Sequence, residues 1–141
     1  MNLRTHLSKQ GTFFIAGRND ETNEELISQA KPDEYVFHTE KAGSPFVNIK
    51  GIPKSGDLKE AAIMCARYSR EWKKRPLNVV VHYFLGKDIS KSKLMKLGTF
   101  GVKKAKTIKV TKEEINSFIC VPIKKKRLLE FLNHLENTQQ L

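Results

Sequence analysis

The sequence predicts an α+β fold: a mixed, mainly antiparallel β-sheet with a long helix packed on one face and a C-terminal helix. Apolar runs of strand length, closed by Gly or Pro, recur along the chain, and two longer stretches have the period of amphipathic helices. The chain has 141 residues, of which 39% are hydrophobic, so it has the size and apolar content of one folded domain. We therefore expect a single domain over 1–141.

The first half of the chain is expected to hold three strands and two helices. Apolar, aromatic and β-branched residues gather in the three predicted strands, 11–16, 34–39 and 46–50. Asn19 is the expected N-cap of a helix that ends near Ala30, because acidic residues follow it and favour the positive end of the helix dipole. Asp57 and Glu60 have capping-box spacing, which predicts a long main helix from Asp57 to about Lys74.

The strongest strand signal comes next, over 77–84. This segment is nearly all apolar, so we predict a central strand of the sheet. Residues 98–110 alternate well enough for one or two further strands, bent at Gly101.

The C-terminal part is expected to add a short helix, a strand and a final helix. Thr111 and Glu114 form a second capping box, which begins a short turn of helix. Residues 118–121 are predicted to form a strand, and 124–137 the final helix. Its expected apolar face consists of Leu128, Leu129, Phe131, Leu132 and Leu135.

The charge of the chain favours a polyanionic partner. The formal net charge is +11 and the isoelectric point is near 9.7. Residues 86–141 carry 13 basic and five acidic side chains, so +8 of this charge lies in the C-terminal part. Nucleic acid is the leading candidate partner. Lysine enrichment without any partner is the alternative.

Other classes of protein are less consistent with the sequence. Cys65 and Cys120 lie far apart among apolar neighbours, which favours buried reduced thiols over a zinc site. We expect no metal and no cofactor. No apolar run approaches the length of about 20 residues that spans a bilayer, so we expect no membrane association and a cytoplasmic location, or a nuclear one in a eukaryote.

An ordered set of short motifs carries a family resemblance. These are Phe-Ile-Ala-Gly-Arg-Asn-Asp-Glu-Thr-Asn from residue 14, Tyr-Val-Phe-His from residue 35, Ala-Gly-Ser from residue 42, Leu-Lys-Glu-Ala-Ala from residue 58, Ala-Arg-Tyr-Ser from residue 66, and the basic run 103–108. The set resembles the RNA-binding domain of the NFACT family, which includes RqcH and the eukaryotic nuclear export mediator factor. The resemblance covers about 11–110. Residues 111–141 form a basic extension without a counterpart, and Pro45 stands where the family commonly has His.

The resemblance implies RNA binding linked to translation. It implies tRNA or ribosomal RNA as the ligand, a role in ribosome-associated quality control and contact with the large ribosomal subunit. It does not imply catalysis, so we expect a binding protein and not an enzyme. Its oligomeric state is left open.

The turn after the first predicted strand is the leading candidate for RNA contact. Arg18 and Asn19 lie where a strand meets a helix N-terminus, and free backbone amides at such a place bind phosphate. A plain capped turn is an equal alternative, with Asp20 and Glu21 near the same amides.

His38 and Ser44 are candidate RNA contacts in the next predicted strand and its turn. Their spacing also allows a base and a nucleophile, but no carboxylate is placed by the sequence to orient the histidine. An RNA-modifying or RNA-cleaving enzyme that uses His38 with Asp20 is therefore a minor alternative. A DNA-binding module and a protein-interaction adaptor are two others.

Two basic clusters complete the candidate interface. Arg67 and Arg70, with Lys73 and Lys74, recur at helical spacing, which predicts a basic stripe on the main helix. A late ribbon contributes the other cluster, in which alternate side chains could follow a phosphate backbone: Lys103, Lys104 and Lys106.

Overall fold

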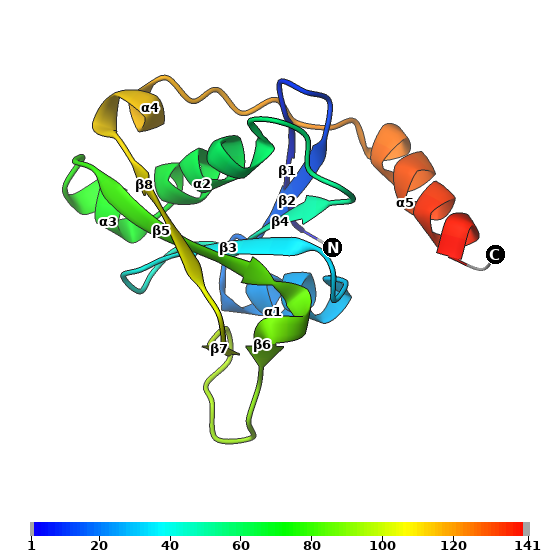
Figure 1. The fold of residues 1–141 in the computed structure, drawn as a ribbon, viewed down its shortest axis with the longest axis horizontal. Coiled ribbons are helices and arrows are strands. Elements are labelled where there is room, and N and C mark those ends of the chain that lie inside the picture. Colours follow the sequence, from blue (N-terminus) through cyan, green and yellow to red (C-terminus); the bar gives the residue numbers. More distant parts are fainter. Residues whose placement is uncertain (1, 140–141) are drawn as a thin grey trace.

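A computed structural model describes residues 2–139 and confirms the α+β class. Six strands form one sheet in the order β1-β2-β4-β3-β5-β8, and every neighbouring pair is antiparallel (Figure 1). Their bounds are β1 Arg4–Leu7, β2 Phe13–Ala16, β3 Tyr35–Thr39, β4 Val47–Lys50, β5 Val79–Leu85 and β8 Lys106–Val110. A small ribbon of β6 (Ile89–Ser90) and β7 (Gly101–Val102) follows the short helix η1 (Gly86–Asp88) and extends the β5–β8 hairpin.

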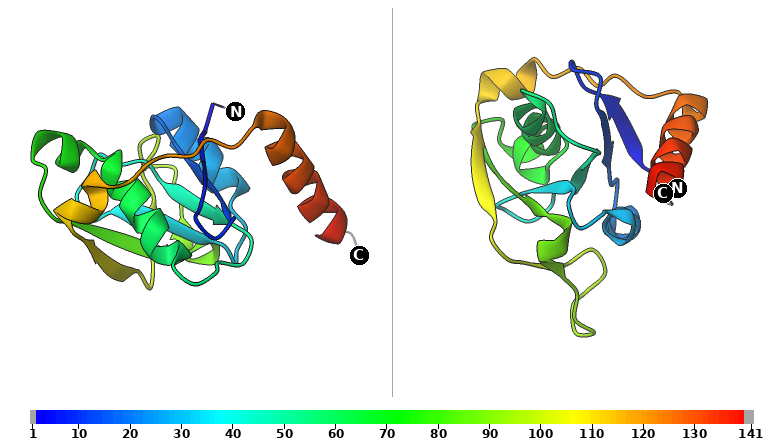
Figure 2. Two further views of the ribbon diagram at one scale, coloured as in Figure 1. Left: turned by 90° about the horizontal axis from the view of Figure 1, so that it is seen from above. Right: turned by 45° about the vertical axis from the view of Figure 1, so that its right-hand side comes forward.

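The helices cover both faces of the sheet. Their bounds are α1 Asp20–Gln29, α2 Asp57–Arg67, α3 Arg70–Lys74, α4 Lys112–Asn116 and α5 Lys125–Gln139. On one face α2 buries small side chains, including Ala61 and Cys65, against Phe37 and Val81. On the other face Leu26 of α1 packs with residues such as Val36 and Phe84. Figure 2 shows this layering from two further directions.

The predicted main helix is shorter than expected, because the chain breaks at Tyr68 and Ser69. The extended backbone of Ser69 (ψ 152°) begins α3 as a separate helix. Its Oγ donates to the carbonyl of Ala66 (2.7 Å) and accepts from the amide of Trp72 (3.2 Å). The continuous basic stripe predicted over this helix is therefore wrong, because Arg67 is separated from the cations of α3.

The predicted capping box at the start of α2 is also wrong. Gly56, at a φ of 91°, is the N-cap, and both acidic side chains turn to tertiary contacts. Asp57 is fully buried and accepts from the Thr12 hydroxyl (2.5 Å) and the Lys54 amide (2.7 Å). Glu60 accepts from Nε2 of His6 (2.6 Å). The capping boxes at Asn19 and Thr111 are present.

One edge of the sheet differs from the expectation. The first ten residues carry no strong strand pattern, yet Arg4–Leu7 forms β1 through pairing with β2. Residues 118–121 are not a strand. They run along the outer side of β1, where Leu7 N–H donates to the Val121 carbonyl (2.8 Å) and Val121 N–H donates to Nδ1 of His6 (2.9 Å).

The C-terminal helix is confirmed as α5. It lies beside β1 and β2 and extends away from the body (Figures 1 and 2). The Phe131 ring lies 4.3 Å from the Phe13 ring between centroids. The side chains of Leu132 and Leu135 lie outside the described residues. Over the described part of the chain, the helices lack the length and hydropathy of a membrane span.

Candidate nucleic-acid interface

A cavity of about 270 Å³ opens where the ends of several elements meet. It lies between β1, the β2–α1 turn, the β3–β4 loop and the α2–α3 junction. The residues that line it are Arg4, Gly17, Arg18, Asn19, Asp20, Asn23, Gly43, Ser44, Pro45, Tyr68, Arg70 and Lys73. Residues far apart in the sequence thus form one pocket, called here the Arg pocket.

The β2–α1 turn is built tightly around a buried asparagine. Asn23 Oδ1 accepts from the Phe46 amide (3.0 Å), and the amide of Gly17 donates to the Phe46 carbonyl (3.0 Å). A Cβ at Gly17 would lie 1.9 Å from Asn23 Oδ1, so only glycine fits this position. The turn therefore holds the Arg18 side chain at the pocket mouth on a fixed backbone.

The β3–β4 loop is tied to α3 on the opposite wall. Gly43, at a φ of 95°, accepts the Arg70 amide through its carbonyl (2.7 Å), and a Cβ on Gly43 would meet Arg70 Cβ at 3.1 Å. Ser44 Oγ is buried and accepts from the Thr39 amide (3.0 Å). Ser44 thus shapes the loop.

Positive charge dominates the pocket. Arg4, Arg18, Arg70 and Lys73 line it, and among its described lining residues Asp20 is the one carboxylate. Arg4 Cζ lies 3.8 Å from the centroid of the Tyr68 ring, so this aromatic face orients the guanidinium. Burial raises the pKa of Tyr68, which favours the protonated phenol. Such a set of donors suits a phosphate.

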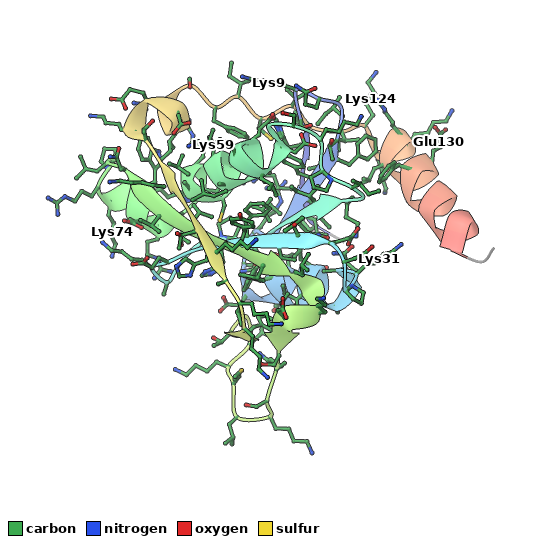
Figure 3. The ribbon with its side chains drawn as sticks, in the orientation of Figure 1. Lys9, Lys31, Lys59, Lys74, Lys124 and Glu130 are labelled. Atoms are coloured by element: carbon green, nitrogen blue, oxygen red, sulfur yellow. The ribbon has the colours of Figure 1, made fainter. Side chains whose placement is uncertain are left out.

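A second cavity of about 390 Å³ adjoins the Arg pocket and shares Arg70 with it. Three further basic side chains line it, namely Lys41, Lys74 and Arg75. Figure 3 places Lys74 at the end of the molecule that α3 occupies. Basic residues therefore continue from the Arg pocket along α3.

Four of the predicted site residues meet in the Arg pocket: Arg18, Asn19, Ser44 and Arg70. Three of the backbone amides at this turn are already occupied. Thr22 Oγ1 accepts from the amides of Arg18 (2.7 Å) and Asn19 (2.9 Å), and Asn19 Oδ1 accepts from the Thr22 amide (2.9 Å). Side chains, and not these amides, supply the donors.

His38 and Arg67 lie away from this pocket. Nδ1 of His38 donates to the Thr39 carbonyl (2.8 Å), and its ring packs on Phe46 (4.6 Å between centroids). Burial lowers the pKa of His38. Arg67 Nη1 donates to the Ile115 carbonyl of α4 (3.4 Å), which is a structural contact.

The late lysines form a separate exposed cluster. Lys103 and Lys104 lie in the turn between β7 and β8, where Lys104 has a φ of 55°, and Lys106 begins the edge strand β8. Lys106 pairs with Tyr83 and Lys109 with Val80, so these two side chains point to opposite faces of the sheet. The four lysines do not share one face.

Tyr68 and Arg4 are lining residues that escaped the sequence prediction. Tyr68 belongs to the Ala-Arg-Tyr-Ser motif, so the motif itself carried the signal. Arg4 lies on β1, which the pattern did not predict, and its role follows from tertiary pairing alone.

Comparison with known proteins agrees with this architecture. The model of the NFACT protein RNA binding domain matches residues 2–104. The archaeal Rqc2 homologue aRqcH of Methanocaldococcus jannaschii is 39% identical over 67 residues, which are 45% of this chain and 10% of that protein. The matched segment thus spans about a tenth of this curated relative.

A solved structure has the same fold. The C-terminal part of the fibronectin/fibrinogen-binding protein from Streptococcus suis superposes with a TM-score of 0.73 and 26% identity, over 86% of this chain and 50% of that one. Since the family model covers more than half of the chain, the protein belongs to the NFACT RNA-binding domain family.

Proposed function

We propose that this chain binds tRNA or ribosomal RNA through the Arg pocket, as part of ribosome-associated quality control in the cytoplasm. Membership of an RNA-binding domain family supports the class of ligand. The similarity to the archaeal Rqc2 homologue supports the link to that process. Contact with the large ribosomal subunit is what the resemblance to the NFACT family implies.

One observation carries the choice of site. Arg4, Arg18, Arg70 and Lys73 come from three separate parts of the fold, and they converge on one concave site. Gathering like charges costs free energy unless an anion offsets it. An RNA backbone supplies such anions at regular spacing, and the basic side chains along α3 extend the track.

The burial and protonation of the candidate nucleophiles, Ser44 and Cys65, favour a binding function over a catalytic one. Ser44 Oγ is buried in hydrogen bonds with the Thr39 amide and the Pro45 carbonyl. Burial raises the pKa of the Cys65 thiol to about 12, which leaves it protonated and unreactive. His38 lies on the face of β3 that packs with Phe46, away from Ser44. A His38→Ala variant should therefore keep the affinity for RNA.

The test is RNA affinity as a function of salt. Titrating labelled tRNA and a ribosomal RNA fragment should give a linear fall of log affinity with log salt. Arg18→Ala and Arg70→Ala should each weaken binding and reduce the steepness of this line by about one, because each removes a phosphate contact. Both side chains are exposed, so neither change should unfold the protein.

Lys112→Ala is the matched control, because Lys112 is an exposed cation on α4, outside the pocket lining. It should leave affinity and salt dependence near those of the wild type. If Lys112→Ala and Arg70→Ala lowered the RNA affinity equally, the Arg pocket would contribute only general charge attraction and would not be a specific site. Equal competition by duplex DNA would reject a preference for RNA.

A further inference from the structure

The loop between β6 and β7 projects beyond the sheet at the far end of the β5–β8 hairpin (Figure 1). We call residues 91–100 the hairpin tip. Leu94 is 97% exposed there and Leu97 is 53% exposed. A single exposed leucine is common on a protein surface, but two of them at the end of a projection are accessible to another molecule.

The conformation of the hairpin tip is fixed from its base. Lys91 Nζ donates to Glu24 Oε1 of α1 (2.6 Å) and to the carbonyls of Lys96 (2.5 Å) and Thr99 (2.9 Å). These contacts use all three donors of the ammonium group. Gly98 N–H donates to the same Glu24 oxygen (3.0 Å). The hydrogen bond from Lys91 lowers the pKa of Glu24, which favours the charged carboxylate.

The tip combines apolar and cationic chemistry. Residues 91–104 contain five lysines and no acidic residue. The ammonium group of Lys91 is hydrogen-bonded within the protein, whereas Lys93 and Lys96 flank Leu94 and are exposed. Lys103 and Lys104 lie at the base of the same hairpin and are also exposed. This surface complements a partner that has an anionic exterior next to an apolar interior. Nucleic acid has this structure, with phosphates outside and stacked bases inside, and RNA is the ligand class of the family.

We propose that the hairpin tip is a second RNA contact, in which Leu94 inserts beside an unstacked base while Lys93 and Lys96 bind the flanking phosphates. Apolar wedges of this kind open a base step in known nucleic-acid complexes, and a bulge or loop is the easiest place to open. The proposal rests on the proposed function, because it names a further site for the same ligand. It also goes beyond the Arg pocket, which binds through charge.

Leu94→Ser in the full chain tests the wedge. Because the side chain is already in water, the fold should be unaffected. Affinity for tRNA should fall about tenfold, the effect of removing one leucine from an apolar contact, while the salt dependence stays unchanged. A Lys93→Ala and Lys96→Ala double variant should instead reduce the steepness of the salt dependence by about two.

Ile52→Ser is the matched control, because Ile52 is 89% exposed in the loop after β4, on a different part of the surface. It should bind as the wild type does. A bulged RNA hairpin with 2-aminopurine at the bulge gives a second readout. Its fluorescence should rise on binding the wild type and the Ile52→Ser variant, and should stay low with Leu94→Ser.

The outcomes separate this proposal from the function proposed above. If Leu94→Ser binds as the wild type does while Arg70→Ala binds weakly, the wedge is rejected and the Arg pocket stands. If Leu94→Ser loses binding only to anionic lipid vesicles, or only to a ribosomal protein, the tip belongs to that partner and the wedge is again wrong. If the wild type binds none of the RNAs, both proposals fail.

Discussion

At the scale of single residues, the pocket depends on a glycine and the asparagine behind it. Gly17 leaves room for Asn23, whose side chain accepts from the amide of Phe46 just before β4. The turn therefore links the β2–α1 corner to the β3–β4 loop. Two opposite walls of the Arg pocket are positioned by this one contact.

Gly17→Ala should lower the free energy of unfolding by about 1–3 kcal/mol, because the added methyl group overlaps Asn23 Oδ1. Urea denaturation measures this change. In an Asn23→Ala background the overlap disappears, so the same substitution should cost much less. Additive effects of the two changes would contradict the packing described here.

His38 provides a pH-dependent prediction. Burial lowers the pKa of its imidazole, and the nearby His82 on β5 lowers this pKa further. The hydrogen bond to the Thr39 carbonyl raises the pKa and offsets part of this shift. The unfolded chain therefore binds more protons than the folded one just below pH 6.5, the ordinary value. This histidine's contribution to stability is complete above pH 6.5 and is lost as the pH falls towards the folded pKa.

Proton NMR of the His38 Cε1–H resonance should give a midpoint below 6.5. His38→Gln should flatten the fall in the free energy of unfolding between that midpoint and pH 6.5. A midpoint at or above 6.5 would contradict the burial of the ring.

At the scale of elements, α3 matters more than its five residues suggest. It carries Arg70 and Lys73 of the Arg pocket together with Lys74 of the adjoining cavity. Ser69 sets its direction by ending one helix and capping the next. The break between α2 and α3 turns these cations towards the β3–β4 loop.

Ser69→Ala should cost about 1 kcal/mol of stability and also weaken RNA binding, because the cap of α3 is lost. Thr111→Ala removes a comparable cap from α4, which carries no pocket residue among those described. It should cost a similar free energy of unfolding, measured with urea, and leave RNA affinity unchanged. If both variants bind RNA equally well, α3 has no role in positioning the cations.

At the scale of the whole molecule, most of the net charge lies in one part of the chain and the residues that line the Arg pocket lie in another. Residues 86–141 carry +8 of the net charge, while the described residues that line the Arg pocket fall between Arg4 and Lys73. Long-range attraction therefore comes largely from one part of the chain and close contact from another. These two contributions act on different rate constants.

Reversing the charge of exposed lysines on β8, as Lys106→Glu with Lys109→Glu, should mainly slow association with tRNA. Arg70→Ala should mainly speed dissociation, because it removes a close contact. Surface plasmon resonance at two salt concentrations separates the two effects. The reverse pattern would place the close contact on β8.

The fold could be predicted from the sequence wherever a local pattern decides the structure. The apolar strand around Val81 and the capping box at Thr111 are such cases, and both are present in the structure. β1 was missed because Arg4–Leu7 becomes a strand only through its partner β2. The pair Asp57 and Glu60 has capping-box spacing, but buried contacts to Thr12 and His6 prevail.

Only part of the Arg pocket could be predicted, because only some of its residues lie in a local sequence pattern. Arg18 and Asn19 lie at a turn that is visible in the sequence, whereas Arg4 and Tyr68 join them only after the sheet and α2 are assembled. The convergence of these elements depends on tertiary structure. It therefore cannot be predicted from the spacing of residues along the chain.

The anchor of the hairpin tip on α1 has a consequence for both proposed contacts. A Cβ on Gly98 would lie 2.8 Å from Asp20 Oδ1, so the tip lies against the same first turn of α1 that forms a wall of the Arg pocket. If bound RNA shifted the tip, it would press on this wall. Any change that one contact made in the affinity of the other would then be reciprocal, as thermodynamic linkage requires. The first turn of α1 would make the two contacts one cooperative unit.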